Sequence, residues 1–185
     1  MKKIFIFTLL FFSICSHSQT YIKANAVTAL LLVPNIGVET SIGKKITFQA
    51  DVMASFWESF NGHHPMKLYS LVTEVRYHFQ EKYNGFYFGG HAGVDRYQIQ
   101  KWIYWDTNMY EDGIGYKFGA TIGYEKKLND RLLLDFFVGG GWHQGYYKGY
   151  YNDGTPGRYE NVKNWNRSGD WLPYRGGIMV SYRLN

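Results

Sequence analysis

The stretch GIGYKFGATIGYEKKLNDRLLLDFFVGGGW, residues 113–142, decides the fold that the sequence predicts. From Ile114 to Tyr124 every second residue is apolar or aromatic, and the same alternation resumes after the turn-like residues 126–130. Because side chains on a strand alternate between two faces, each half has one apolar face and one face of small or charged residues. Each half is about 12 residues long, near the length that crosses a bilayer at a tilt, roughly 9–11 residues. The stretch therefore predicts a hairpin of a transmembrane β-barrel.

The overall composition fits one β-rich domain. The chain has 185 residues, of which 19% are aromatic, and it contains 21 Gly and only 4 Pro. This bias favours β structure over a helical bundle, and the length suggests a single domain. The formal net charge of +5 is too mild to indicate nucleic-acid binding.

The first 18 residues have the pattern of a secretory signal peptide. Lys2 and Lys3 precede the apolar run 4–12, and the triplet 16–18 is a small-x-small cleavage site. We therefore predict a cleaved signal at residues 1–18, a β-barrel domain at 19–185 and location in the outer membrane. The only cysteine, Cys15, falls in the signal, so the exported chain is expected to lack disulfides.

The alternation recurs along the whole chain. Longer polar segments at 57–68, 99–112 and 143–172 separate the predicted strands, and short links join the others. Membrane barrels show this asymmetry between tight periplasmic turns and long outer loops. The fold class predicted is all-β, an eight-stranded antiparallel up-and-down transmembrane β-barrel. The predicted strands cover residues 21–28, 36–42, 46–56, 69–79, 85–95, 114–125, 132–142 and 173–184.

Several short motifs carry a resemblance to known barrels. The closing residues 175–182, RGGIMVSY, resemble the terminal assembly signal of small OmpA/OmpX-type outer-membrane barrels, although three residues follow Tyr182. The segments KAN (23–25), PNIGVE (34–39) and GKK (43–45) resemble an uncharacterised Gram-negative outer-membrane β-barrel family, a domain of unknown function. The resemblance covers nearly all of the exported chain. It implies a fold and a compartment, and it carries no catalytic residues.

Charged residues occupy the face of the strands that the alternation places inside the barrel. An eight-stranded barrel is only just wide enough for its own side chains, so these charges must pair with one another. We predict a salt-bridged polar core, with an ion path or a ligand pocket as the alternative. The predicted interior network is Glu39, Asp51, Glu74, Arg76, Asp95, Lys117, Glu125, Asp135 and Arg175.

Candidate catalytic and metal-binding residues are few. His63 and His64 are adjacent in a loop and lack further ligands nearby, so no metal site is predicted. His143 shares the last long segment with Ser168 and Asp170, but a nucleophile, a base and an acid must meet in space. We predict no catalytic residues and no cofactor.

The long outer segments carry the strongest candidates for a binding surface. Rigid aromatic residues mixed with Asn and Gly are typical of recognition loops. The alternative is that these aromatics only extend the strands or form the interfacial belt. Lys148, Arg158, Lys163 and Arg167 could also contact lipid phosphates. The candidate binding residues are Trp102, Trp105, Tyr146, Tyr147, Tyr150, Tyr151, Trp165 and Trp171.

The function that the sequence favours is non-enzymatic: a structural or surface-interaction barrel in the outer membrane. Its expected partners are outer-membrane lipid, the barrel-assembly machinery during biogenesis, and an extracellular glycan or protein. Nucleic acid is not expected, and the chain is expected to be a monomer. The first alternative is an outer-membrane lipid-modifying enzyme, a hydrolase or acyltransferase. The second is a soluble lipocalin-like barrel that binds an apolar ligand inside.

Overall fold

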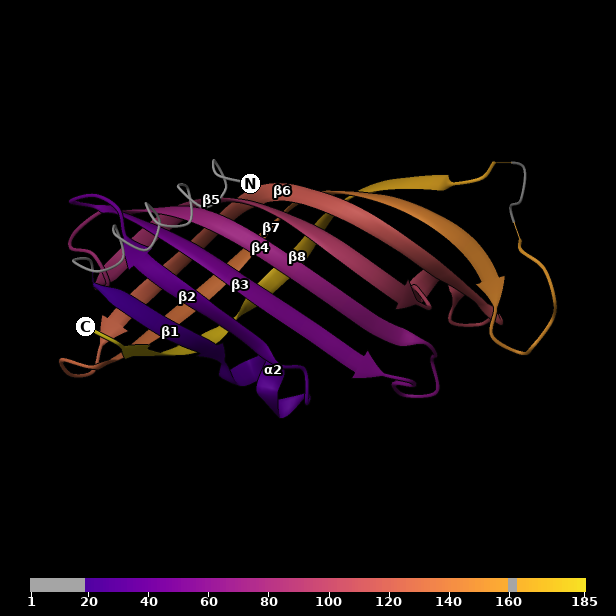
Figure 1. Ribbon diagram of the computed structural model, residues 1–185, viewed down its shortest axis with the longest axis horizontal. Helices are drawn as coiled ribbons and strands as arrows, with labels where there is room; N and C mark the ends of the chain where they lie inside the picture. The colour runs from indigo at the N-terminus through magenta and orange to yellow at the C-terminus, as the bar shows by residue number, and fades with distance from the viewer. Residues whose placement is uncertain (1–18, 160–162) are drawn as a thin grey trace, which may run out of the picture.

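Eight antiparallel strands form one closed ring in the computed structural model, which describes residues 19–159 and 163–185 (Figure 1). The predicted signal, residues 1–18, lies outside the described residues. Each strand pairs with its neighbour in sequence, and β1 also pairs with β8. The all-β class and the eight up-and-down strands are thereby confirmed. The strands are β1 (Thr20–Asn25), β2 (Asn35–Ser41), β3 (Ile46–Trp57), β4 (Met66–His78), β5 (Gly85–Ile99), β6 (Met109–Lys127), β7 (Leu132–Tyr151) and β8 (Asn166–Arg183).

The two faces of the ring differ in chemistry, as the alternation predicts. Apolar side chains such as Ile122, Val138 and Phe118 point outward and are more than half exposed. Charged side chains such as Glu39 and Asp135 point inward and are fully buried. The interior of this molecule is therefore mainly polar, with small apolar clusters such as Leu133 with Tyr21 and Tyr83, and most of the exposed apolar residues form the outer wall.

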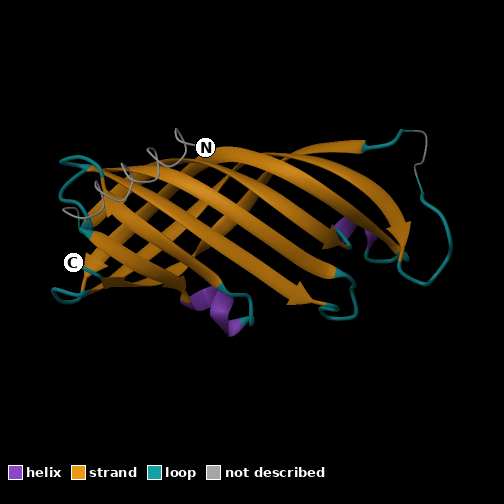
Figure 2. Ribbon diagram, in the orientation of Figure 1, coloured by secondary structure: helices purple, strands orange, loops and turns teal. Residues whose placement is uncertain are grey.

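The wall is uneven in height. Strands β1 and β2 have only 6 and 7 residues, whereas β6, β7 and β8 have 19, 20 and 18. The β6–β8 side consequently extends far beyond the β1–β2 side at the end opposite the C-terminus (Figure 1). A short helix, α2 (Ala26–Leu30), stands where taller strands would continue the wall (Figure 2).

The helix α2 replaces residues that the alternation assigned to a strand ending at Thr28. The Asn25 side chain accepts hydrogen bonds from the backbone N–H groups of Val27 and Thr28, which caps the helix. The following residues, Ala-Val-Thr-Ala-Leu, include good helix formers. A local cap therefore ends β1 earlier than the hydrophobic pattern suggests.

The last predicted loop, 143–172, is largely strand. β7 continues to Tyr151 and β8 begins at Asn166. The outward residues form cross-strand pairs, among them Arg167 over the ring of Tyr146 at 5.5 Å. Such pairs stabilise a hairpin whose sequence looks polar enough for a loop. The segment 99–112 is likewise shorter as a loop, because β6 begins at Met109 and a 3₁₀ turn, η1 (Trp102–Tyr104), precedes it.

One edge of β8 is open. β1 pairs with β8 only through Met179–Arg183, so residues 166–178 have β7 on one side and no strand on the other within the described ranges. Pro173 lies in this part, where its missing N–H leaves no ladder hydrogen bond unmade. Asn25 Nδ2 donates to the Gly176 carbonyl at 3.2 Å, so the helix cap covers part of the edge.

In the part of the chain that the structure describes, no helix has the length and apolar character needed to cross a membrane.

Close approach of β6 and β7 depends on glycine. A Cβ at Gly119 would meet the backbone of Gly140 and Gly141, whereas a Cβ at Gly90 on the outer wall would meet nothing within 4 Å. Gly119→Ala should therefore lower the free energy of unfolding by about 1–3 kcal/mol through overpacking. The matched Gly90→Ala should be neutral or stabilise by up to about 1 kcal/mol. Urea titration of both variants checks this, and equal effects would contradict the packing account.

Candidate functional site

The interior layer nearest the short turn between β6 and β7, the end of the ring that we call the lower end, contains five buried charged residues. We call this layer the lower charge cluster: Lys23, Glu39, Arg76, Glu125 and Asp135. Lys23 Nζ lies 2.5 Å from Glu39 Oε2, 2.7 Å from Asp135 Oδ2 and 3.4 Å from Glu125 Oε1. Arg76 Nη1 contacts the same three oxygens at 3.0, 2.8 and 3.4 Å. All five side chains are 0–1% exposed. Two cations thus share three carboxylates in the middle of the ring.

Those contacts hold together strands that are distant in sequence. Lys23 comes from β1, Arg76 from β4 and Asp135 from β7. Removing one partner of such a buried pair leaves an uncompensated charge, which costs several kcal/mol. The lower charge cluster therefore joins opposite sides of the ring and fills its cross-section at this level.

His78 lies against the lower charge cluster. Its Nε2 is 3.0 Å from Thr47 Oγ1, and its Nδ1 is 3.6 Å from Glu125 Oε2. Ligand atoms of Glu39, His78 and Glu125 fall within 4.8 Å of one another, a spacing that a metal ion could use. Lys23 and Arg76 already neutralise both carboxylates, so a metal ion there would face two fixed cations. The residues fit a salt-bridged core better than a metal centre.

Tyrosines close both ends of the interior. Tyr83, between β4 and β5, is fully buried, and its hydroxyl donates to the Gln19 carbonyl at 2.8 Å. Burial raises the pKa of Tyr83. At the opposite end, between β7 and β8, the Tyr159 hydroxyl donates to the Tyr110 carbonyl at 3.2 Å, and burial again raises the pKa of Tyr159. Neutral phenols therefore cap a charged interior.

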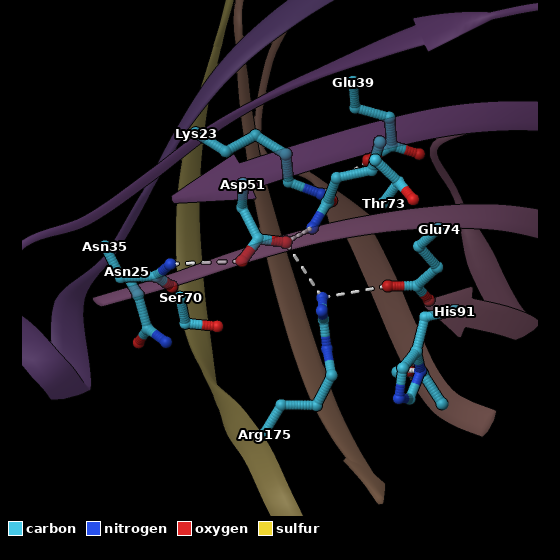
Figure 3. A network of polar contacts seen from close by, with 12 residues as sticks. Lys23, Asn25, Asn35, Glu39, Asp51, Ser70, Thr73, Glu74, His91 and Arg175 are labelled. Carbon is cyan, nitrogen blue, oxygen red and sulfur yellow. Dashed lines mark hydrogen bonds and ion pairs between the residues drawn. The ribbon is translucent and has the colours of Figure 1, made fainter. Parts of the chain in front are cut away.

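The middle layer is built around Arg175 from β8. Its Nη2 donates to Glu74 Oε2 at 2.9 Å and to Asp51 Oδ2 at 3.1 Å, so the guanidinium lies between the two carboxylates (Figure 3). Asn35 Nδ2 donates to the other Asp51 oxygen at 3.2 Å. Nearby, His91 bridges Thr121 and Tyr174.

The upper layer joins Lys117 to Asp95 at 2.8 Å and to the Ser70 hydroxyl at 2.8 Å. His143 Nε2 lies 3.3 Å from Asp95 Oδ2, which gives an acid beside a base. Ser168 sits opposite Gly145, close in register to His143, but its hydroxyl accepts from Lys101 Nζ at 3.2 Å. The hydroxyl of Ser168, the candidate nucleophile, therefore bonds to a cation. The residue directly opposite Ser168 on β7 is Gly145, whereas His143 lies opposite Asp170.

All the predicted interior residues lie inside the ring. The lower charge cluster contains Glu39, Arg76, Glu125 and Asp135. The middle layer contains Asp51, Glu74 and Arg175, and the upper layer contains Asp95 and Lys117.

The predicted binding aromatics separate into three groups. Trp102 and Trp105 lie at the rim between β5 and β6, where Trp105 stacks on His63 at 4.4 Å. On the tall β7–β8 hairpin, Trp165 lies under Lys148 at 5.0 Å and Trp171 packs on Trp142. Trp102, Trp105, Trp165 and Trp171 are 74%, 48%, 40% and 75% exposed, and Tyr146 and Tyr150 are partly exposed.

Two of the predicted binding tyrosines have interior contacts. Tyr147 is only 6% exposed and lies beneath the ammonium of Lys101, 5.5 Å from its ring centre. Tyr151 packs edge-on against the buried Tyr159. The exposed part of the surface is therefore smaller than the predicted set.

Some interior partners were missing from the predicted network. Tyr87 donates from its hydroxyl to Asp135 Oδ1 at 2.9 Å, and Thr47 donates to Glu39 Oε1 at 2.5 Å. Lys23, which the alternation places inside with the other cations, touches all three carboxylates of the lower charge cluster. Strand alternation places each of them inside, but it does not indicate which inward residues touch.

The lower charge cluster predicts a specific pattern of stability. Arg76→Met leaves three buried carboxylates facing Lys23 alone and should cost about 3–5 kcal/mol. Adding Asp135→Asn to Arg76→Met removes one of those charges and should recover part of the loss. The matched Arg96→Met, at a side chain 47% exposed, should cost about 1 kcal/mol or less. Urea unfolding of the original chain, these three variants and the single variant Asp135→Asn measures this, and additive effects in the double variant would contradict the shared network.

Comparison with known proteins gives a family but no activity. The family model described as "Protein of unknown function (DUF3575)" matches residues 4–184. A search of the curated proteins finds no significant match. Since the family model spans nearly the whole chain, this protein belongs to the DUF3575 family.

Proposed function

We propose that this chain is a monomeric, non-enzymatic β-barrel of the outer membrane that presents an aromatic and cationic surface to the cell exterior. The observation that carries the proposal is the inversion of the two faces of the ring. Apolar rows cover the outside, and acidic and basic side chains fill the inside. Soluble proteins rarely expose continuous apolar surface of this kind, whereas a lipid-facing wall requires it.

Aromatic residues stand at both ends of the apolar rows. Tyr77 and Phe79 lie at the end that holds the C-terminus, and Tyr69 and Phe56 lie towards the other end, all more than 40% exposed. Aromatic side chains prefer the two membrane–water interfaces. Their placement supports a wall that crosses the bilayer, with the short turns at the periplasmic side.

The length of the strands agrees with this orientation on most of the ring. β3–β8 have between 12 and 20 residues, enough to cross a bilayer at a tilt, which takes roughly 9–11. β1 and β2 are shorter, and the apolar residues Leu30, Leu31 and Leu32 of the α2 region are 85%, 51% and 76% exposed. In the proposed orientation these leucines contact lipid where the strands stop.

The tall β7–β8 hairpin is the proposed contact surface. Lys148 lies over Trp165 and Arg167 over Tyr146, so two cations and two rings share one face. Ring stacking holds each long cation in place, and such preorganised cations suit phosphate or carboxylate groups. We propose anionic glycolipid or lipid head groups at the exterior as the partner, with the barrel-assembly machinery acting only during biogenesis.

The alternatives receive less support. A lipid-modifying enzyme would draw on the contact between Asp95 and His143, but the hydroxyl of Ser168 is engaged by Lys101. A lipocalin-like binder needs an apolar interior, and the interior here holds the lower charge cluster.

The membrane proposal predicts a depth-dependent penalty on the outer wall. Ile122, in mid-wall, and Ile42, beside the β2–β3 turn, are 60% and 51% exposed. Ile122→Lys should cost about 2–4 kcal/mol in lipid, whereas Ile42→Lys should cost about 0–1 kcal/mol. Refolding into lipid vesicles with urea titration measures both. Equal, small effects would contradict a lipid-facing wall, because an exposed isoleucine in water tolerates lysine.

The contact surface predicts a loss of binding without a loss of folding. The double variant Lys148→Ala/Arg167→Ala should weaken binding of soluble anionic head-group analogues by roughly tenfold, with a strong dependence on salt. The matched control Lys126→Ala/Lys127→Ala removes two exposed cations at the opposite end of the ring and should leave binding unchanged. Isothermal titration with an inositol polyphosphate probe compares them. Equal weakening by both pairs would point to net charge alone and refute a localised surface.

A further inference from the structure

A small cavity connects the interior with the seam between α2 and β8. Its volume is about 80 Å³, and its lining includes Asn25 and Thr28 at the helix and Asn35, Asp51, Arg175 and Gly176 around it. A water needs only roughly 10–15 Å³ of such space, so the cavity has room for a small polar group.

Arg175 points unused hydrogen-bond donors at this region. Its side chain is only 7% exposed, and Nη2 alone makes the bonds to Asp51 and Glu74. Nε and Nη1 are buried, and among the described residues neither has a hydrogen-bond partner. A buried donor left unsatisfied is destabilising, so the site favours a ligand that supplies an acceptor.

The local charge limits what that acceptor can be. Arg175 is shared by two carboxylates, Asp51 and Glu74, and Lys117 in the cavity lining is already paired with Asp95. A further anion would meet more negative than positive charge, and like charges in a buried site repel. An uncharged group such as a hydroxyl or a carbonyl satisfies Arg175 without this repulsion.

The two elements that form the seam, α2 and β8, also carry exposed apolar side chains. The low β1–β2 wall leaves the edge of β8 open above Met179. Leu30 and Leu31, at the end of α2, are 85% and 51% exposed, and Leu172 on β8 is 41% exposed. An alkyl chain can lie along these side chains while a small head group reaches the cavity.

We propose that the α2–β8 seam binds a single-chain lipid, whose small uncharged head group accepts hydrogen bonds from Arg175 and whose alkyl chain lies on α2. This inference rests on the proposed membrane location, since the alkyl chain would come from the surrounding lipid. The seam thus joins the polar interior to the lipid-facing wall at one defined point.

The test compares three probes that share a sixteen-carbon alkyl chain and differ in the head group: hexadecanol, hexadecanoate and hexadecane. The full chain is folded in non-ionic detergent, and native mass spectrometry counts bound probe. Hexadecanol should form a one-to-one complex, and each of the other two probes should bind at least roughly tenfold more weakly than hexadecanol. Tighter binding of hexadecanoate would overturn the uncharged head group. Absence of any hexadecanol complex would leave a cavity filled by water and overturn the proposal.

Two variants and a matched control locate the site. Arg175→Lys keeps the charge between Asp51 and Glu74 but removes Nε and Nη1, so hexadecanol binding should fall roughly tenfold or more. Thr28→Trp should block the cavity, whereas Ala92→Trp, at an exposed position of β5 outside the cavity lining and away from α2, should bind like the original chain. Equal binding by all of these proteins would overturn the site.

A failure of the proposed membrane location can be told apart from a failure of the proposed lipid site. Every preparation is also run unheated and heated on a detergent gel, which reports the membrane-barrel property independently of hexadecanol. A chain that remains soluble without detergent and still binds hexadecanol through Arg175 would contradict the membrane location and keep the site.

Discussion

The sharing of three carboxylates between Lys23 and Arg76 is the interaction on which the rest of this structure depends. A ring whose outer wall is apolar has only small apolar clusters inside, so its strands are held together mainly by backbone ladders and by the polar interior side chains. Buried charges are stable only when paired, which makes each cation a link between distant strands. The same requirement leaves little free space, and the interior is closed by Tyr83 and Tyr159 at its ends.

Strand alternation made most of the fold predictable from the sequence. A period of two fixes which residues share a face, so the outward position of Ile122 and the inward position of Asp135 follow from counting. The pattern failed where local chemistry competes with it. The Asn25 cap turns the end of the first strand into α2, and cross-strand pairs such as Tyr146 with Arg167 extend a hairpin through a polar segment.

The candidate sites were predictable in part. Alternation placed Glu39, Arg76 and Arg175 inside, yet it contains no information about which charges meet across the ring, because that depends on register and shear. Residue type alone assigned Tyr147 to the outer surface, whereas its inward position buries it under Lys101. The open edge of β8 depends on the unequal lengths of β1 and β8, and no sequence motif predicts that difference in length.

The most direct test of the central claim is fractionation of the expressed protein, followed by unheated and heated gel electrophoresis in detergent. The account predicts recovery in the outer membrane and a folded band that shifts on heating, because the closed ring resists detergent until its strands separate. A soluble periplasmic protein with no shift would contradict a lipid-facing wall and would require another cover for the exposed apolar rows.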